Sequence, residues 1–257
     1  MLPFARTKKI IIFNKKTMNY FYITGTSKGL GKSLAEKLLS DKNNFVYGLS
    51  RTQIINHKNY KHISMDLSKL DEVEKFDFDL PSDAKKVILI NNAGIIGEIK
   101  KVGDRTTQDI ISTFNINTTA PSILMNSFIA KFQNQDIEKI ILNISSGAGR
   151  HTIESWAAYC ASKSALDMYS QVIYDEQKHF KKETAVKIYS VAPGIVDTPM
   201  QDQIRLADKS DFPIVDNFIN YKKTGVLSST SEISEILINF LKNSQKYKNV
   251  IYDVREL

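Results

Sequence analysis

The chain has 257 residues, a hydrophobic fraction of 42%, a charged fraction of 25% and a formal net charge of +7. These values are ordinary for a globular protein, and no apolar run reaches the roughly 18 residues of a membrane-spanning helix, so we expect no membrane association. Because Cys160 is the only cysteine, the chain has no intrachain disulfide or cysteine zinc cluster, and we expect a reducing, cytoplasmic location.

The positive charge is concentrated before Met18. Five basic residues and no acidic ones precede it, whereas the remainder carries 30 basic and 28 acidic residues. The other basic residues form scattered pairs and no continuous stripe, so we expect no nucleic-acid partner. We interpret residues 1–17 as a basic extension, either a flexible arm or an upstream start, and residues 18–257 as one domain without an internal linker.

The first predicted strand, Tyr20–Ile23, leads into the glycine-rich segment TGTSKGLG at residues 24–31 and then a helix. Glycines in such a unit let the backbone approach a pyrophosphate, whose charge the helix N-terminus stabilises. The pattern predicts a dinucleotide site; a glycine-rich loop without a ligand is the alternative. The expected cofactor contacts are Gly25, Ser27, Lys28, Gly29, Leu30 and Gly31.

The second predicted strand, residues 44–49, ends in Ser50-Arg51. A site for NAD usually has a carboxylate here that binds the ribose 2′-hydroxyl, and this chain has none. Arg51 and Lys28 would instead bind a 2′-phosphate, which predicts NADPH/NADP+ as the cofactor. The alternative is that both are solvated surface cations.

Two more strands are expected to contribute cofactor contacts. The strand at residues 63–67 contains Asp66, which we expect at the adenine edge with Leu67. The apolar strand at residues 87–90 stops at the tight turn NNAG, which is suited to backing a cofactor. The expected contacts in that turn are Asn92, Ala93 and Gly94.

Residues suited to acid/base chemistry follow. Residues 107–132 read as one long helix with Asn117 inside it, where asparagine competes with the backbone and needs a reason to be present, such as capping of a kink. Ser146 follows a strand at residues 139–142, and a helix beginning near Trp156 places Tyr159 and Lys163 on one face. A nearby ammonium lowers the pKa of a tyrosine and suits it to proton transfer. A buried tyrosine beside a solvated lysine is the alternative.

The strand at residues 185–191 ends in a break that turns the chain over the strand ends, where open α/β sheets bind ligands. Residues 199–226 then form a polar, partly helical excursion that would act as a lid. We expect Trp156 and Met200 to form an apolar substrate wall, although Trp156 could simply belong to the core. The expected cofactor contacts after the break are Pro193, Gly194, Val196 and Thr198.

Strands that alternate with helices predict a single α/β domain with a Rossmann-type, doubly wound parallel sheet. A last helix near residues 231–241 and a strand at 250–252 would close it. The four histidines show no metal-ligand spacing, so no metal site is expected.

From about Met18 to the C-terminus the chain resembles the short-chain dehydrogenases/reductases. The motifs that match in order are TGxxxGxG, NNAG, Asn117, Ser146 with Tyr159-x-x-x-Lys163, and Pro193-Gly194. The resemblance implies that Ser146 and Tyr159 bind a carbonyl oxygen and that Tyr159 protonates it after hydride transfer from NADPH. It also implies that Lys163 lowers the tyrosine pKa and binds the nicotinamide ribose, that Asn117 holds a water for proton return, and that the protein is a homodimer or other homo-oligomer.

Within the family, the chain is similar to bacterial benzil reductases and, more distantly, to sepiapterin reductases. The similarity lies in residues 24–31, 155–160, 197–201 and 251–254. Val250 stands where sepiapterin reductases carry a pterin-anchoring carboxylate, which disfavours a pterin unless Asp253 substitutes. We expect an NADPH-dependent reductase of ketones or α-diketones; the alternatives are an acyl-carrier-protein ketoreductase, a sepiapterin reductase and a regulator that binds NADPH without turnover.

Overall fold

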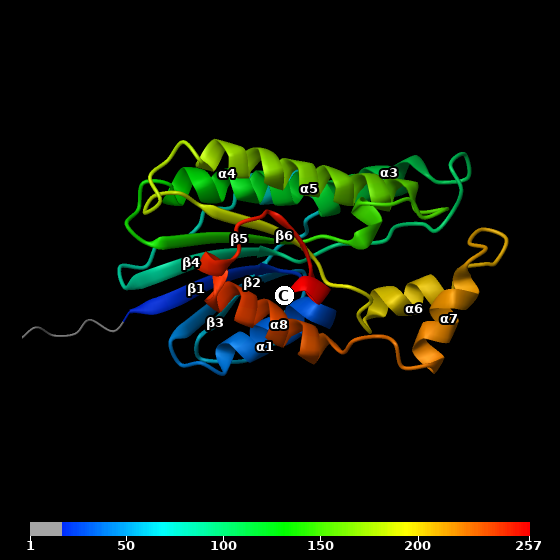
Figure 1. Ribbon diagram of the computed structural model, residues 1–257, viewed down its shortest axis with the longest axis horizontal. Helices are drawn as coiled ribbons and strands as arrows, with labels where there is room; N and C mark the ends of the chain where they lie inside the picture. Colours follow the sequence, from blue (N-terminus) through cyan, green and yellow to red (C-terminus); the bar gives the residue numbers. More distant parts are fainter. Residues whose placement is uncertain (1–16) are drawn as a thin grey trace, which may run out of the picture.

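A seven-stranded parallel sheet organises the described residues, 17–257, of the computed structural model (Figure 1). Residues 1–16 of the expected basic extension lie outside the described residues. The strand order β3-β2-β1-β4-β5-β6-β7 reverses between β1 and β4, and open α/β sheets bind ligands beside such a point. The strands are β1 (Met18–Thr24), β2 (Asn44–Ser50), β3 (Tyr60–Ser64), β4 (Ala84–Asn91), β5 (Glu138–Ile144), β6 (Lys187–Ala192) and β7 (Ile251–Asp253).

Helices cover both faces of the sheet (Figure 1). The pair α1 and α8 packs on one face, α4 and α5 pack on the other, and α6 and α7 extend beyond one end of the sheet. No helix among residues 17–257 has the length and apolar character that crossing a membrane requires. The helices are α1 (Gly29–Leu39), α2 (Leu70–Glu74), α3 (Thr107–Phe114), α4 (Ala120–Phe132), α5 (Ala157–Gln177), α6 (Pro199–Arg205), α7 (Val215–Lys223) and α8 (Thr230–Lys242).

The central strands are apolar on both faces because each face is covered. In β4, Ile88 and Ile90 pack in the cluster under α1 and α8, whereas Val87 and Leu89 pack in the cluster under α4 and α5. A continuous apolar run is the pattern that a doubly covered parallel strand produces. The structure confirms the predicted α/β, Rossmann-type doubly wound sheet.

One strand prediction is wrong in its bounds. β3 spans Tyr60–Ser64, three residues before the predicted strand at residues 63–67. The Tyr60 ring lies over Gly48 of β2, where a Cβ would come within 2.0 Å of the Tyr60 hydroxyl, and that hydroxyl is 3.0 Å from Oγ1 of Thr26. This packing fixes the register of β3, so Asp66 lies in the connection that follows the strand.

Gly31 allows α1 to start directly against the end of β1. A Cβ on Gly31 would lie 2.4 Å from the Gly25 carbonyl oxygen and 2.3 Å from Nδ2 of Asn92. Separations this short require the backbone of the turn to move.

We therefore expect Gly31→Ala to lower the free energy of unfolding, measured by urea denaturation, although alanine inside a helix is normally favoured over glycine by about 1 kcal/mol. Glu36→Ala, at an exposed position of the same helix, is the control and should change stability little. A more stable Gly31→Ala protein would contradict the close approach.

Candidate active site

Thr24 joins two of the predicted cofactor turns at the point where the strand order reverses. Its Oγ1 accepts hydrogen bonds from the backbone N–H groups of Asn92 and Ala93, both at 3.0 Å. The Asn92 side chain donates back to the Thr24 carbonyl at 2.9 Å. The glycine turn after β1 and the NNAG turn after β4 are therefore held together at the carboxyl edge of the sheet.

The glycine turn has the shape that close approach of a ligand requires. Gly25 and Gly29 have φ of +77° and +58°, in the left-handed region that glycine tolerates. No side chain caps the N-terminus of α1 and its first turn has no acidic residue, so its positive end is open to an anion. Lys28 is exposed and Ser27 half-buried at this end, whereas Leu30 is buried in the core and could contact a ligand only through its backbone.

Arg51 and Asp66 lie near each other on the β2 side of the edge. Arg51 is exposed, and the Asp66 carboxylate accepts hydrogen bonds from Ser68 N at 3.0 Å and Oγ at 2.8 Å. Burial raises the pKa of Asp66, but the Ser68 hydrogen bonds and the charge of Arg51 lower it overall. Leu67, beside it, is buried in the core.

The turn after β6 lies at the same edge. Gly194 has φ of +72°, and Val196 is buried and forms an isolated bridge with Ser228. Thr198 precedes α6 and lies against the glycine turn, because a Cβ on Gly29 would be 3.6 Å from its Cγ2. Half-buried Pro193 precedes Gly194, so the four predicted residues of this turn follow β6 directly.

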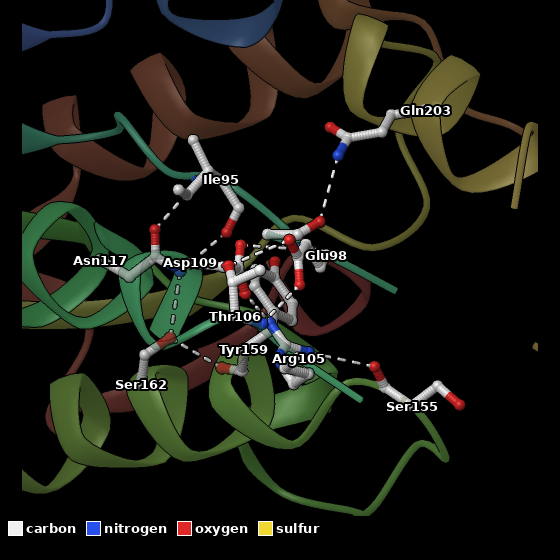
Figure 2. A network of polar contacts seen from close by, with 11 residues as sticks. Ile95, Glu98, Arg105, Thr106, Asp109, Asn117, Ser155, Tyr159, Ser162 and Gln203 are labelled. Carbon is white, nitrogen blue, oxygen red and sulfur yellow. Dashed lines mark hydrogen bonds and ion pairs between the residues drawn. The ribbon is translucent and has the colours of Figure 1, made fainter. Parts of the chain in front are cut away.

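Asn117 lies in a π-helical segment, Asn115–Thr119, that interrupts the predicted helix over residues 107–132. Pro121 explains the interruption, because it has no N–H for the Asn117 carbonyl four residues earlier. The fully buried Asn117 side chain accepts from Ile95 N at 2.9 Å and donates to Ile95 O at 2.8 Å. It also donates to Oγ of Ser162 at 3.1 Å (Figure 2). The side chain of Asn117 is thus fully engaged in hydrogen bonds within the protein.

Helix α5, which carries Tyr159 and Lys163, is tied to the same network. Oγ of Ser162 donates to the Tyr159 carbonyl oxygen at 2.8 Å, and Nζ of Lys163 donates to the Ile144 carbonyl oxygen at 2.9 Å. Nζ of Lys163 is 5.9 Å from the centre of the Tyr159 ring. Gly94 lies beside both groups, since a Cβ there would be 3.3 Å from Oδ1 of Asn117 and 3.5 Å from Nζ of Lys163.

Burial is the main influence on the pKa values of Tyr159 and Lys163. Burial raises the pKa of Tyr159 and the hydrogen bond with Ser146 lowers it, with a net rise. Burial lowers the pKa of Lys163 to about 8, against the charge of Asp167, which raises it. The pKa of Tyr159 therefore shifts in the direction opposite to the one predicted from its spacing to Lys163, because the effect of burial is the larger one.

An ion pair that the sequence analysis did not identify fixes the Ser146 turn to α5. Nε of Arg150 is 3.1 Å from Oδ2 of Asp167, and Oδ1 of Asp167 accepts from Oγ of Ser190 at 2.6 Å. Asp167 lies four residues after Lys163 on the same helix face, which marks it as a neighbour of that lysine, but no local pattern indicates its pairing with Arg150. The pair therefore holds the serine turn beside the helix that carries Tyr159.

An apolar cluster lies over Tyr159. Trp156 is 5% exposed, with its ring centre 5.7 Å from that of Tyr159 and 5.5 Å from those of Phe212 and Phe218. Trp156 is therefore buried and also packed against the ring of Tyr159, so the two interpretations of this residue do not exclude each other. Half-buried Met200 packs against the same cluster. Phe212 and Phe218 were missed, although residues 212, 215 and 218 repeat apolar side chains every three positions.

Comparison with known proteins agrees with this arrangement. The sequence pattern of the short chain dehydrogenase family matches residues 19–209. The chain is 36% identical to the benzil reductase ((S)-benzoin forming) of Bacillus subtilis over 245 residues, which cover 93% of this chain and 99% of that protein. It is 24% identical to the sepiapterin reductase of Bos taurus over 245 residues, 87% of this chain and 89% of that protein. The predicted resemblance is confirmed.

Solved structures share the fold. A short chain dehydrogenase/reductase of Saccharomyces cerevisiae has a TM-score of 0.76 at 22% identity, covering 92% of this chain and 96% of that chain. A 4-hydroxyisoleucine dehydrogenase complexed with NADH (21% identity; 91% of this chain, 96% of that chain) and the closed form of a serine dehydrogenase complexed with NADP+ (17%; 91% and 93%) both have TM-scores of 0.73. At these identities the likeness concerns the fold alone.

Proposed function

Because this chain belongs to the short-chain dehydrogenase family, we propose that it is an NADPH-dependent reductase of ketones or α-diketones. The observation that carries the proposal is the enclosure of Tyr159 and Lys163 together: both side chains are buried, and Nζ of Lys163 lies 5.9 Å from the centre of the Tyr159 ring. Paired acid/base groups in such surroundings are typical of a catalytic site. Similarity over almost the full length of a benzil reductase supports the substrate class.

The residues at the carboxyl edge fit a nicotinamide dinucleotide. Left-handed glycines and the open N-terminus of α1 suit a pyrophosphate. Arg51 and Lys28 would bind a 2′-phosphate, and Lys163 would bind the nicotinamide ribose. When bound, the nicotinamide supplies the hydride that reduces the carbonyl carbon. The other expected contacts, in the turns after β3, β4 and β6, follow neighbouring strand ends around the same edge.

Side chains of the protein would supply the proton that the carbonyl oxygen of the substrate accepts. Oγ of Ser146 accepts from Ala148 N at 3.2 Å, which leaves its hydrogen for donation to a substrate carbonyl oxygen. Tyr159 would donate its phenolic proton to that oxygen as negative charge develops there, and its raised pKa keeps it protonated before reaction. Lys163 would stabilise the resulting phenolate, and a water on the Asn117 carbonyl would return the proton.

The alternatives find less support in the same surroundings. A basic patch near the site would favour an acyl-carrier-protein ketoreductase, and three lysines of the nearby loop and lid, Lys101, Lys209 and Lys222, are each paired with a carboxylate. A sepiapterin reductase would need Asp253 for the pterin, and its two carboxylate oxygens accept from Arg255 at 2.7 and 2.8 Å. A regulator without turnover would not need the acid/base groups.

A homodimer or other homo-oligomer remains part of the proposal. The side chains of Met168, Tyr169 and Val172 are exposed on the outer surface of α5, and exposed apolar faces of this kind suit burial against a second copy. The cytoplasmic location, the small-molecule carbonyl substrate and the absence of a nucleic-acid partner stay predictions.

Tyr159→Phe should lower kcat for carbonyl reduction by about 10²–10⁴-fold, because general acid catalysis contributes that much. The NADPH dissociation constant should stay close to wild type, since the ring remains against Trp156. Tyr169→Phe, at an exposed position of the same helix, is the control. Retention of more than half of the wild-type kcat would rule out Tyr159 as the acid.

Arg51→Ala should lower the ratio of kcat/KM for NADPH to that for NADH by about tenfold or more, because a hydrogen bond to a charged group contributes about 1.5–3 kcal/mol. Arg51→Lys keeps the charge without the planar fork and should have a smaller effect. An unchanged ratio in Arg51→Ala would show that the preference has another source.

The value of kcat/KM for NADPH, which reports ionisations of the free enzyme, should fall as the pH rises through about 8. Burial lowers the pKa of Lys163, so the ammonium is present below this pH and lost above it, while the raised pKa of Tyr159 keeps the phenol protonated. Tryptophan fluorescence at each pH would check that the protein remains folded. A profile that stays flat to about pH 9.5 would contradict this assignment.

A further inference from the structure

A buried ion pair lies beneath the apolar cluster that covers Tyr159. The side chain of Arg105 is 3% exposed and that of its partner Asp109 is 12% exposed, and Nη2 of Arg105 donates a hydrogen bond to Oδ2 of Asp109. Charges removed from water lose favourable hydration, so a buried pair is weak evidence of a stabilising role. Its contacts with other segments of the chain indicate a different role.

The pair connects three segments (Figure 2). Nη1 of Arg105 donates to the carbonyl oxygen of Ser155, just before α5, at 3.3 Å. Oδ1 of Asp109, at the start of α3, accepts from Glu98 N at 2.7 Å. The Glu98 carboxylate in turn accepts from N and Oγ1 of Thr106 at 2.9 and 3.1 Å, which closes the loop between β4 and α3.

Among residues 17–257, Ser155 is the one residue other than glycine that has a positive φ, at +68°. A left-handed conformation is unfavourable for a residue with a Cβ and persists only where its surroundings hold it. Arg105 binds the Ser155 carbonyl, and Oγ of Ser155 donates to the Asp211 carbonyl in the excursion. This turn sets the direction in which the next residue, Trp156, leaves the backbone and meets Tyr159 and Phe212.

The loop after β4, which contributes Ile96 to the apolar cluster, packs on the same pair of Arg105 and Asp109. A Cβ on Gly97 would lie 2.8 Å from Oδ1 of Asp109 and 3.0 Å from Nη2 of Arg105, so the loop backbone packs directly on the two charges. The Gly97 carbonyl accepts from Nε2 of Gln203 in α6 at 3.1 Å. Ile96, the preceding residue, is buried in the cluster with Trp156 and Tyr159.

We propose that Arg105 is a positioning residue that, with Asp109, holds Ile96, Trp156 and the lid in one arrangement and so determines whether bulky aryl ketones fit beside Tyr159. The inference rests on the proposed function for its substrates. A small diketone needs little of this wall, whereas an aryl diketone must pack against all of it. Loss of Arg105 should therefore impair reduction of the large substrate far more than reduction of the small one.

The chain offers a matched control. Lys101 and Glu154 join the same loop to the residue before Ser155, but at 3.7 Å and with side chains 52% and 55% exposed. Exposed pairs of this kind contribute little. Lys101→Met removes a cation between the same two segments without touching the buried pair.

The experiment compares Arg105→Met, Arg105→Lys and Lys101→Met with the wild type. Arg105→Lys keeps a positive charge beside Asp109 but lacks the planar guanidinium that binds Asp109 and the Ser155 carbonyl at the same time. KM and kcat are measured with benzil and with diacetyl, together with the NADPH dissociation constant and the melting temperature. Both Arg105 variants should raise KM for benzil by about tenfold or more, since small changes in an apolar pocket alter substrate discrimination by about 10–200-fold, and leave kcat/KM for diacetyl within about threefold. Lys101→Met should match the wild type.

A second readout needs no substrate. Trp156 is the only tryptophan of the chain, so fluorescence excited at the red edge of the absorption band, where tyrosine does not absorb, reports on Trp156 alone. Acrylamide should quench Trp156 more strongly in both Arg105 variants than in wild type or Lys101→Met, because the buried ring gains access to solvent. If wild type reduces neither diketone, the proposed function fails while quenching still tests the inference. Unchanged quenching in both Arg105 variants, or an equal loss on the two diketones, would overturn it.

Discussion

The buried amide of Asn117 is the interaction on which the candidate site depends. Its two ends bind the backbone of Ile95 and the hydroxyl of Ser162, which binds the Tyr159 carbonyl. A buried amide left without partners loses the full hydration of its polar atoms, so each of these bonds restricts the segment it reaches. The loop after β4, the π-helical segment and helix α5 are therefore held in one geometry by the side chain of Asn117.

The parallel sheet explains why these segments meet. Each connection leaves the carboxyl end of its strand, so turns that are far apart in the chain gather along one edge. Thr24 links the first two at the point where the strand order reverses, and Arg150 with Asp167 fixes the serine turn to α5. Enclosure of Tyr159 and Lys163 then moves their pKa values in opposite directions, since burial disfavours the charged form of each.

Much of this could be predicted from the sequence because the relevant signals are local. Apolar runs such as residues 87–90 identify doubly covered strands, and glycines at 25, 29 and 31 identify the turn because few other residues fit its backbone. The register of β3 could not be predicted, because it depends on the packing of Tyr60 over Gly48 from another strand. The direction of the Tyr159 pKa was also wrong, since spacing along a helix does not report how deeply the pair is enclosed.

The sequence by itself determined the strand and helix order, the doubly wound sheet and the identity of the residues at its carboxyl edge, because these follow from periodicity and from backbone requirements within a few residues. Only the tertiary structure decided what those residues contact. Trp156 is both buried and next to Tyr159, and the Asn117 side chain is committed to Ile95 and Ser162. Arg105 reaches Ser155 across fifty positions of the chain. Burial, charge pairing and hydrogen-bond partners arise between segments distant in sequence, and no local pattern encodes which of them meet.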